Sequence, residues 1–457
     1  MFNVIFNMYF IKKIFPFSFL ILSTLILLYV FYKSQIYWNG ENNSYYLFYH
    51  IISISFFIFS IILFFLKKEA KIYLIIFSIS IFSTLYIFEG FLIYNKTIIE
   101  KKRTKIKEDI YKKETGKRFD HRTVFEVYTD LKKKDKNVVV GSYPRANLNL
   151  GVNNKDFFSL SGVSNANTIY CNENGYMSID LTDRYGFNNP DKIWDSKNID
   201  FLVIGDSLAQ GACVNRPDDI ASTLRTISNK NVINLGYGGN GPLIEYATLR
   251  EYLSPNVKKI FWLYSEWNDL ENIEDEKKSL ILLKYLQDES FSQKLRSRQE
   301  EINKFTLKTI DNELEKKINS NRNYLIIKNF IKLRNARNIL NIYLPEKYQP
   351  KLQAPKKLQN DFKEIMTLVK KLAEKNNSKL YFVYMPEYNR FLNDYDDSSF
   401  FTVKKIIDEI GISFINIHKE VFEKEKNPLI LFPFEMPGHY NAEGYKKVSK
   451  VLYEISK

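Results

Sequence analysis

Three long apolar segments occupy the first hundred residues and restrict how this chain can fold. Residues 14–32, 45–66 and 72–94 are each close to the roughly 20 residues that an α-helix needs to cross a hydrocarbon core. Apart from His50 in the second segment and Glu89 in the third, they contain no histidine or charged residue. We therefore predict a three-helix transmembrane anchor over residues 1–95. A cleaved signal peptide would explain the first segment at most.

The lysines that flank these segments predict their orientation. Two lysines precede the first segment and three lie between the second and the third, whereas the link at 33–44 holds only one. By the positive-inside rule, the amino terminus and the second link face the cytoplasm. An odd number of spans then carries the rest of the chain to the outer side of the membrane.

Residues 96–136 are strongly basic, with 15 Lys and Arg against 8 Asp and Glu, and hold half of the formal net charge of +14. A basic run just beyond an apolar region is suited to lipid headgroups at least as well as to nucleic acid. We expect a solvated helical stalk here, with the lipid bilayer as partner and no nucleic acid.

Over residues 137–195 the sequence changes from a charged helical pattern to short strand-like pieces. Short strand-like pieces at 138–140, 168–171 and 177–181 are separated by Asn- and Gly-rich turns. We predict a small strand-rich domain, which ends in a structural turn at 183–190.

The chain has two cysteines, Cys171 in this small domain and Cys213 beyond it. Their spacing to each other and to histidine is unlike that of zinc ligands, so we expect no metal. Two states are open for the pair: a disulfide, which we predict, or two buried free thiols.

From residue 196 onward the sequence alternates between strands and helices. We expect strands at 201–204, 232–235, 260–264, 379–384 and 412–417, and helices at 242–253, 357–375, 401–410 and 442–455. Such alternation predicts an α/β domain at 196–457, with a mainly parallel sheet covered by helices. A charged helical insertion at about 270–350 interrupts it.

Polar blocks follow three of these strands and precede the last helix. In chain order they contain Ser207 within Gly205-Asp206-Ser207, Gly239 within a Gly-rich turn, Asn268 within Glu266-Trp267-Asn268-Asp269, and His439 after Gly438. A serine becomes a nucleophile when a base accepts its proton, and histidine has the pKa for that task. A tetrahedral oxyanion also needs fixed donors, and a glycine lets backbone approach closely.

The order of these blocks and their flanks resembles the SGNH/GDSL hydrolase family over about residues 196–457, the insertion excepted. The resemblance implies a flavodoxin-like three-layer sandwich. It also implies that Ser207 is the nucleophile and His439 the base, with Gly239, Asn268 and the backbone of Ser207 as oxyanion donors. Residues 170–175 and 183–190 look like those of membrane-anchored bacterial members that act on acylated cell-envelope polysaccharide.

Two positions depart from the family pattern. The third block usually begins with glycine, where this chain has Glu266, and the aspartate usually found three residues before the histidine is replaced by Met436. Glu435 is the nearest carboxylate. Four alternatives remain: Glu435 orients His439, a carboxylate from elsewhere does so, a Ser/His dyad suffices, or the site is degenerate.

The resemblance predicts a serine esterase or O-acyltransferase that needs no cofactor. It would act on acyl, most simply acetyl, esters of an envelope glycan or a small ester, from the outer side of the bacterial inner membrane. One alternative is a degenerate protein that binds carbohydrate or assists polysaccharide assembly. A second is a dinucleotide site, since Gly236, Gly238 and Gly241 also satisfy Gly-x-Gly-x-x-Gly.

Overall fold

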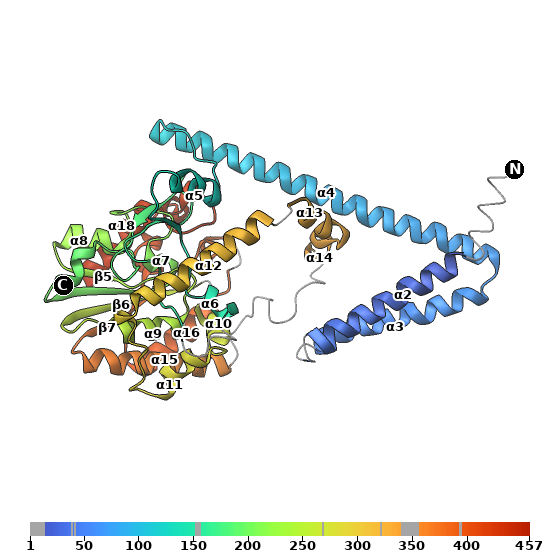
Figure 1. The fold of residues 1–457 in the computed structure, drawn as a ribbon. Helices are drawn as coiled ribbons and strands as arrows, with labels where there is room; N and C mark the ends of the chain where they lie inside the picture. The colour runs from blue at the N-terminus through green and yellow to red at the C-terminus, as the bar shows by residue number, and fades with distance from the viewer. Residues whose placement is uncertain are drawn as a thin grey trace. The chain divides into compact units, whose positions relative to one another are not determined.

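The computed structural model of this chain comprises two compact units (Figure 1). It describes residues 14–37, 40, 43–150, 157–266, 269–319, 322–339, 356–392 and 395–457. Met1–Arg103 and Ser320–Pro350 form the first unit, and Thr104–Asn319 and Lys351–Lys457 form the second. The compact units therefore divide the chain at places other than the three boundaries between the four predicted domains.

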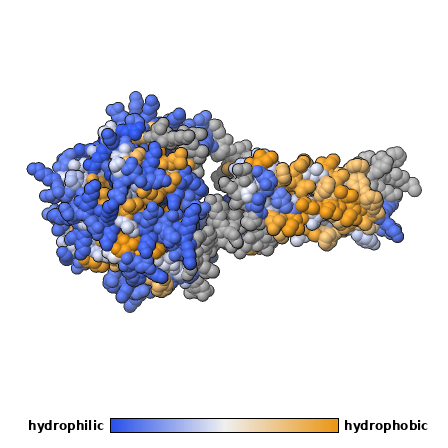
Figure 2. All heavy atoms as spheres, turned by 90° about the horizontal axis from the view of Figure 1, so that it is seen from below, coloured by the Kyte–Doolittle hydropathy of each residue, from blue (hydrophilic) through white to orange (hydrophobic). Residues whose placement is uncertain are grey.

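The first unit is built on the three predicted apolar helices. They are α2 (Phe15–Phe31, continued by the π-helical η2, Tyr32–Tyr37), α3 (Asn43–Phe65) and α4 (Lys68–Thr115). Each is long and apolar enough to cross a membrane. A hydrogen bond of 3.0 Å joins Ser23 on α2 to Ser60 on α3. Most of the apolar side chains point outward, as the orange surface in Figure 2 shows.

The basic stretch predicted as a separate stalk continues α4. This helix runs to Thr115 because no Gly or Pro interrupts the chain between residues 91 and 115. Its last residues belong to the second unit, where Tyr111 packs against Gly175. After a turn, α5 (Val124–Lys132) begins at a capping box formed by Thr123 and Glu126.

The main sheet of the second unit is parallel throughout and has five strands. They are β4 (Ile199–Gly205), β5 (Val232–Asn234), β6 (Val257–Ser265), β7 (Lys379–Met385) and β8 (Ser413–Asn416), in the order β5-β4-β6-β7-β8. This is the doubly wound order of flavodoxin-like folds. The predicted α/β class is confirmed.

Helices cover both faces of this sheet. Leu202 and Ile204 of β4 pack with α9 (Pro242–Tyr252), α15 (Lys356–Lys375) and α16 (Ser398–Ile410). Phe201 and Val203 point to the opposite face, toward α8 (Ile220–Ser228) and α18 (Ala442–Ile455). Because β4 is buried on both faces, its sequence is a continuous apolar run.

A second, three-stranded sheet lies in the same unit. It comprises β1 (Val138–Val140), β2 (Asn167–Ile169) and β3 (Ile179–Leu181). The predicted small domain is not a separate compact unit, because polar contacts join it to the α/β part. Asp180 forms an ion pair with Arg216, and Asn215 accepts a hydrogen bond from the backbone of Ile179.

The described part of the insertion is helical, as predicted, but its helices belong to different units. The second unit contains α10 (Asp269–Glu276), α11 (Leu280–Gln287), η4 (Leu295–Ser297) and α12 (Gln299–Asn319), and the first contains α13 (Arg322–Ile331) and α14 (Arg334–Ile339). The remaining short elements are α6 (Ala146–Leu150), η3 (Asp191–Asp195), α7 (Ser207–Gln210), η6 (Tyr388–Phe391), α17 (Ile417–Glu420), η7 (Phe422–Lys424), η8 (Pro428–Leu431) and η9 (Pro433–Glu435).

Candidate active site

Ser207 lies where β4 ends and the short helix α7 begins. Gly205 makes this tight turn possible: its φ is +151°, and a Cβ there would come within 2.4 Å of the carbonyl oxygen of Leu263. Asp206 braces the turn, since its Oδ1 accepts a hydrogen bond of 3.0 Å from the backbone of Leu208. The serine is therefore held at the carboxyl edge of the sheet, where doubly wound folds place their sites.

The structure brings Ser207 and His439 together across 232 residues of sequence. His439 Nε2 lies 2.9 Å from Ser207 Oγ, within the distance that proton transfer requires. The backbone before α18 positions the imidazole, and Asn441 caps that helix by accepting a bond from Gly444. The two side chains thus come from near the beginning and near the end of the α/β domain's sequence and meet in the folded structure.

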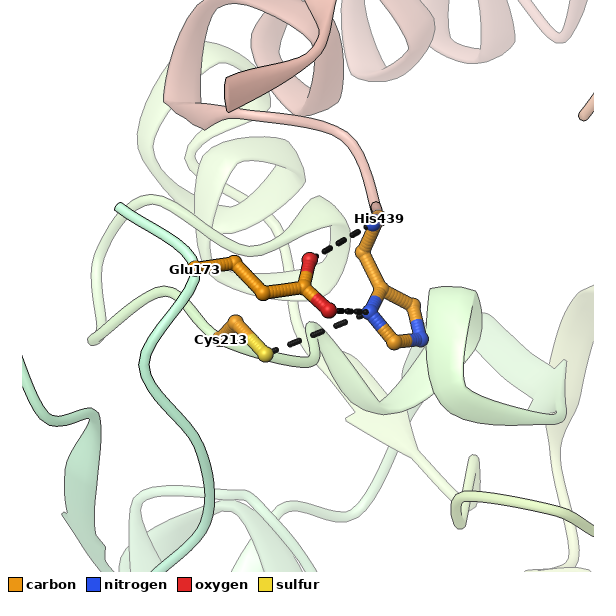
Figure 3. Close-up of side chains that lie close together, drawn as sticks. All are labelled: Glu173, Cys213 and His439. Atoms are coloured by element: carbon orange, nitrogen blue, oxygen red, sulfur yellow. Dashed lines mark hydrogen bonds and ion pairs between the residues drawn. The ribbon is translucent and has the colours of Figure 1, made fainter. Parts of the chain in front are cut away.

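A carboxylate from the small sheet region completes the arrangement. Glu173 Oε1 lies 3.0 Å from His439 Nδ1, and Glu173 Oε2 accepts a bond of 2.7 Å from the backbone N–H of His439 (Figure 3). Gly438 leaves room for this approach, because a Cβ at that position would come within 2.7 Å of Glu173 Oε2. Ser207, His439 and Glu173 are therefore linked by hydrogen bonds in the arrangement of a nucleophile–base–acid triad.

Glu435, the carboxylate nearest in sequence, does not contact His439 in this structure. Phe434 and Glu435 both have positive φ, and the Glu435 carboxylate accepts a hydrogen bond from Asn427. The orienting position next to Nδ1 is occupied by Glu173. Of the four alternatives that Met436 left open, the geometry matches a carboxylate from elsewhere in the chain.

Of the two cysteine states left open by the sequence, the structure has the disulfide Cys171–Cys213. Cys171 lies two residues before Glu173, and Cys213 lies six residues after Ser207, so the bridge ties the acid to the nucleophile. Cys213 Sγ also lies 3.9 Å from His439 Nδ1 (Figure 3). Glu173, Cys213 and His439 are grouped closely enough to suggest metal ligands, but a disulfide sulfur has no thiolate to offer a metal.

The Gly-rich turn after β5 packs against the nucleophile turn. A Cβ on Gly236 would come within 2.5 Å of the Ala209 backbone, and Gln210 Oε1 accepts a bond of 2.9 Å from Gly238 N–H. Gly239, next in the chain, has a φ of +73°. This packing holds the turn beside Ser207 in a conformation suited to glycine. Asn268 lies outside the described residues.

The first turn of α9, which follows this Gly-rich turn, is bound by a buried carboxylate. Glu276 accepts hydrogen bonds from the backbone N–H groups of Gly241, Leu243 and Ile244. Burial raises the pKa of Glu276 to about 7, although these three bonds act to lower it. A dinucleotide pyrophosphate would need the same N–H groups, so the position of Glu276 argues against the dinucleotide alternative.

Glu266, which departs from the family's glycine, forms a buried ion pair. Arg390 donates two hydrogen bonds to its Oε1 and one to its Oε2, and the backbone of Glu387 donates a further one to Oε2. Both charged side chains are almost fully buried. The pair therefore fixes the segment that follows β7, which forms one wall of the site.

A cavity of about 210 Å³ opens at Ser207 and His439. Its other walls include Glu387, Tyr388 and Phe432. Burial raises the pKa of Glu387 above its ordinary value, and the nearby charge of Glu266 raises it further. The cavity is small and mostly apolar, with the nucleophile and the base at its surface.

Electrostatic coupling shifts both members of the acid–base pair. Burial acts to lower the pKa of His439, but the hydrogen bond and the negative charge of Glu173 outweigh it and raise that pKa above its ordinary value. Burial acts to raise the pKa of Glu173, but the contacts with His439 lower it overall. The geometry therefore stabilises an imidazolium–carboxylate pair, as expected of a base that must accept a proton from serine.

We expect the disulfide to be required for full activity. Replacing both Cys171 and Cys213 by alanine frees the loop that carries Glu173, and misplacement of such a group by about 1 Å can lower the rate about 100-fold. Ester hydrolysis by the double variant, compared with the unreduced parent, measures this loss, and circular dichroism checks that the variant is folded. A folded double variant with the parent's activity would show that Glu173 is held without the bridge.

Comparisons with known proteins add a distant likeness. No protein-family model and no curated protein matches this sequence. Among solved structures, a protein assigned to the G-D-S-L lipolytic family from Desulfitobacterium hafniense DCB-2 matches at 12% identity and a TM-score of 0.31, over 56% of this chain and 99% of its own. A G-D-S-L lipolytic family member from Veillonella parvula DSM 2008 matches with the same identity and TM-score, over 56% of this chain and 97% of its own.

Proposed function

We propose that this protein is a membrane-anchored serine esterase or O-acyltransferase of the SGNH/GDSL type, acting through an acyl-serine intermediate. The observation that carries the proposal is the continuous hydrogen-bonded path from Ser207 Oγ through His439 to Glu173. Such a path activates a hydroxyl that is otherwise a poor nucleophile.

The geometry supports a two-step mechanism. His439 Nε2 takes the hydroxyl proton as Ser207 Oγ attacks the ester carbonyl carbon, and Glu173 stabilises the imidazolium that results. Backbone N–H donors at Ser207 and the Gly239 turn stabilise the oxyanion. The C–O bond to the alcohol then breaks, and His439 returns the proton to the departing alkoxide. In the second step His439 takes a proton from water or a sugar hydroxyl, whose oxygen attacks the acyl-serine carbonyl carbon. The bond from that carbon to Ser207 Oγ then breaks, and His439 returns the proton to Ser207.

The dimensions of the cavity support a small, neutral acyl group. A volume of about 210 Å³ is below the roughly 300–1,000 Å³ of pockets that enclose drug-sized ligands. Among the described residues, those that line the cavity include Asp206 and Glu387 and no lysine or arginine, which disfavours an anionic acyl group. An acetyl ester of an envelope glycan fits these requirements, as does a small soluble acetyl ester.

The degenerate alternative rested on Met436, which stands where the family has the aspartate that orients the histidine. Because Glu173 occupies that role in the structure, the observation that favoured a binding protein over an enzyme no longer does so. The same arrangement supports the catalytic proposal.

The apolar helices support a location in the bacterial inner membrane. On this proposal α2, α3 and the apolar part of α4 cross the bilayer, with the flanking lysines on the cytoplasmic side and the α/β domain outside. The Cys171–Cys213 disulfide agrees with an oxidising compartment such as the periplasm.

Labelling and product analysis test this function. A fluorophosphonate is expected to react with the detergent-solubilised protein, and peptide mapping should find the adduct on Ser207. With an acetyl ester donor, free acetate identifies an esterase, whereas acetylated product that appears only when a glycan acceptor is added identifies a transferase. Folded protein that neither reacts with the probe nor cleaves the ester would favour the binding alternative.

A further inference from the structure

Part of the insertion belongs to the first unit, where α13 and α14 pack against the apolar helices. Tyr86 on α4 donates a hydrogen bond to the carbonyl oxygen of Ile331, and its ring lies 5.4 Å from that of Phe330 on α13. Arg337 on α14 donates to the hydroxyl of Tyr49 on α3. Two helices that the sequence placed in the soluble domain, α13 and α14, therefore pack against α4 and α3.

Glu89 on α4 is the centre of this contact. Its side chain is completely buried, although it lies within an apolar segment. Oε1 accepts bonds from the backbone N–H and the side-chain amide of Asn335, and Oε2 accepts one from the backbone N–H of Ala336. An acidic residue in such a segment is costly unless partners satisfy it. Here the insertion supplies those partners.

The position of Glu89 along α4 predicts the depth of the contact. At 1.5 Å per residue, Glu89 lies about 10 Å from Lys96, the first charged residue beyond the apolar segment, and about 27 Å from Lys71 at its other end. The contact therefore lies near the Lys96 end of the span. With a length of about 15 Å, the ten-residue α13 is too short to cross about 30 Å of hydrocarbon.

The outer face of α13 is apolar and its surroundings are basic. Ile327 and Ile331, one helical turn apart on the same face of α13, are 58% and 60% exposed, and Leu325 and Ile326 are about half exposed. The side chains of the described segment 325–339 include four basic residues and no acidic one: Lys328, Lys332, Arg334 and Arg337. An apolar face flanked by cations is typical of helices that lie in the membrane interface and contact anionic lipids.

We propose that α13 and α14 form an interfacial clasp: Glu89 binds them to α4, and their apolar face inserts into the adjoining leaflet of an anionic bilayer. The occupant of the face is lipid, because the face is continuous with a unit whose own surface is apolar (Figure 2). This inference rests on the proposed membrane span of α4. The clasp would hold this part of the insertion at the membrane surface.

Depth-dependent quenching in nanodiscs tests the clasp. Both native cysteines are in the disulfide, so a single introduced cysteine can be labelled with an environment-sensitive fluorophore without reduction. Full-length Ile327→Cys probes α13, Ile79→Cys probes the span at about 12 Å from Lys71, and Leu307→Cys, on α12 in the other unit, is the water-exposed control. The nanodiscs contain phosphatidylglycerol with lipids that carry a spin label at a shallow or a deep position.

We expect the shallow spin label to quench Ile327→Cys most, the deep one to quench Ile79→Cys most, and neither to quench Leu307→Cys. Quenching at position 79 with none at position 327 would refute the interfacial position of α13 but would leave the membrane span of α4 supported. Blue-shifted emission at 327 without quenching would mean that protein covers the face, and would also overturn the clasp. Absence of quenching at position 79 would refute the span and the clasp together.

The Glu89 contact has its own test. In Glu89→Leu the carboxylate acceptors of Asn335 and Ala336 are lost, so we expect shallow quenching at position 327 to fall by about half or more while quenching at 79 is unchanged. Glu89→Gln retains one acceptor and should have an intermediate effect. Unchanged quenching at 327 in both variants would show that Glu89 does not hold the helices.

Discussion

Ser207→Ala protein is expected to cleave acetyl esters on the order of 10⁴–10⁶ times more slowly than the parent, because it lacks the hydroxyl that would form the acyl intermediate. The substitution removes a single oxygen, whose contacts are with His439 and Asp206, so the fold should be retained. Initial rates with an acetyl ester measure the loss, and the thermal unfolding midpoint checks the fold.

Ser265→Ala provides the matched control. Ser265 also lines the cavity, at the carboxyl end of β6, but lacks the bond to His439 Nε2 that defines the nucleophile. Its replacement is expected to change the rate only a few-fold. If Ser207→Ala retained the parent's rate, the acyl-serine mechanism would be refuted.

Glu173→Gln is expected to lower kcat/KM by about 10³–10⁴-fold at neutral pH. An amide has nearly the shape of the carboxylate, but it cannot stabilise the imidazolium, and its NH₂ group favours the wrong tautomer of His439. Glu435→Gln is the matched control, because the Glu435 carboxylate is exposed and contacts Asn427. We expect Glu435→Gln to stay within about twofold of the parent. The opposite ranking of the two variants would return the orienting role to Glu435.

The pH dependence separates the orienting role of Glu173 from a purely structural one. His439 must be neutral to accept the serine proton, and contacts with Glu173 raise its pKa above the ordinary histidine value. Activity of the parent should therefore fall as the pH drops through a value above that of ordinary histidine. Without the negative charge at position 173 the pKa of His439 falls, so this acid limb should shift to lower pH. An unchanged limb with a reduced plateau would indicate that Glu173 only supports the fold.

Much of the architecture could be predicted from the sequence, because helices and strands are indicated by patterns within short stretches of the chain. The apolar runs at 14–32, 45–66 and 72–94 predict α2, α3 and the first part of α4, and the five strands of the main sheet lie within a few residues of their predicted positions. Ser207 and His439 were predicted as a pair from the order of their blocks and the family resemblance, and the structure brings the two side chains together. Blocks that follow parallel strands lie at one edge of the sheet.

The acid was not predictable in this way, because Glu173 is 266 residues from His439 in the chain and lies in a region with its own sheet. A signal was nevertheless present. The predicted pairing of Cys171 with Cys213 brings residue 173 close to Ser207, and Gly438 leaves space beside the histidine. Neither observation identifies Glu173 alone. The same limit explains why α13 and α14 were assigned to the soluble domain: their partner Glu89 is about 250 residues earlier.

The disulfide beside Glu173 also bears on when the proposed active site becomes able to react. Disulfides form in oxidising compartments, and on the proposed topology the chain meets one only after export. The acid is synthesised before the serine, and the histidine comes almost last, so translation alone does not assemble the site. A newly made chain would then stay inert toward cytoplasmic esters, and its activity would be acquired together with its location.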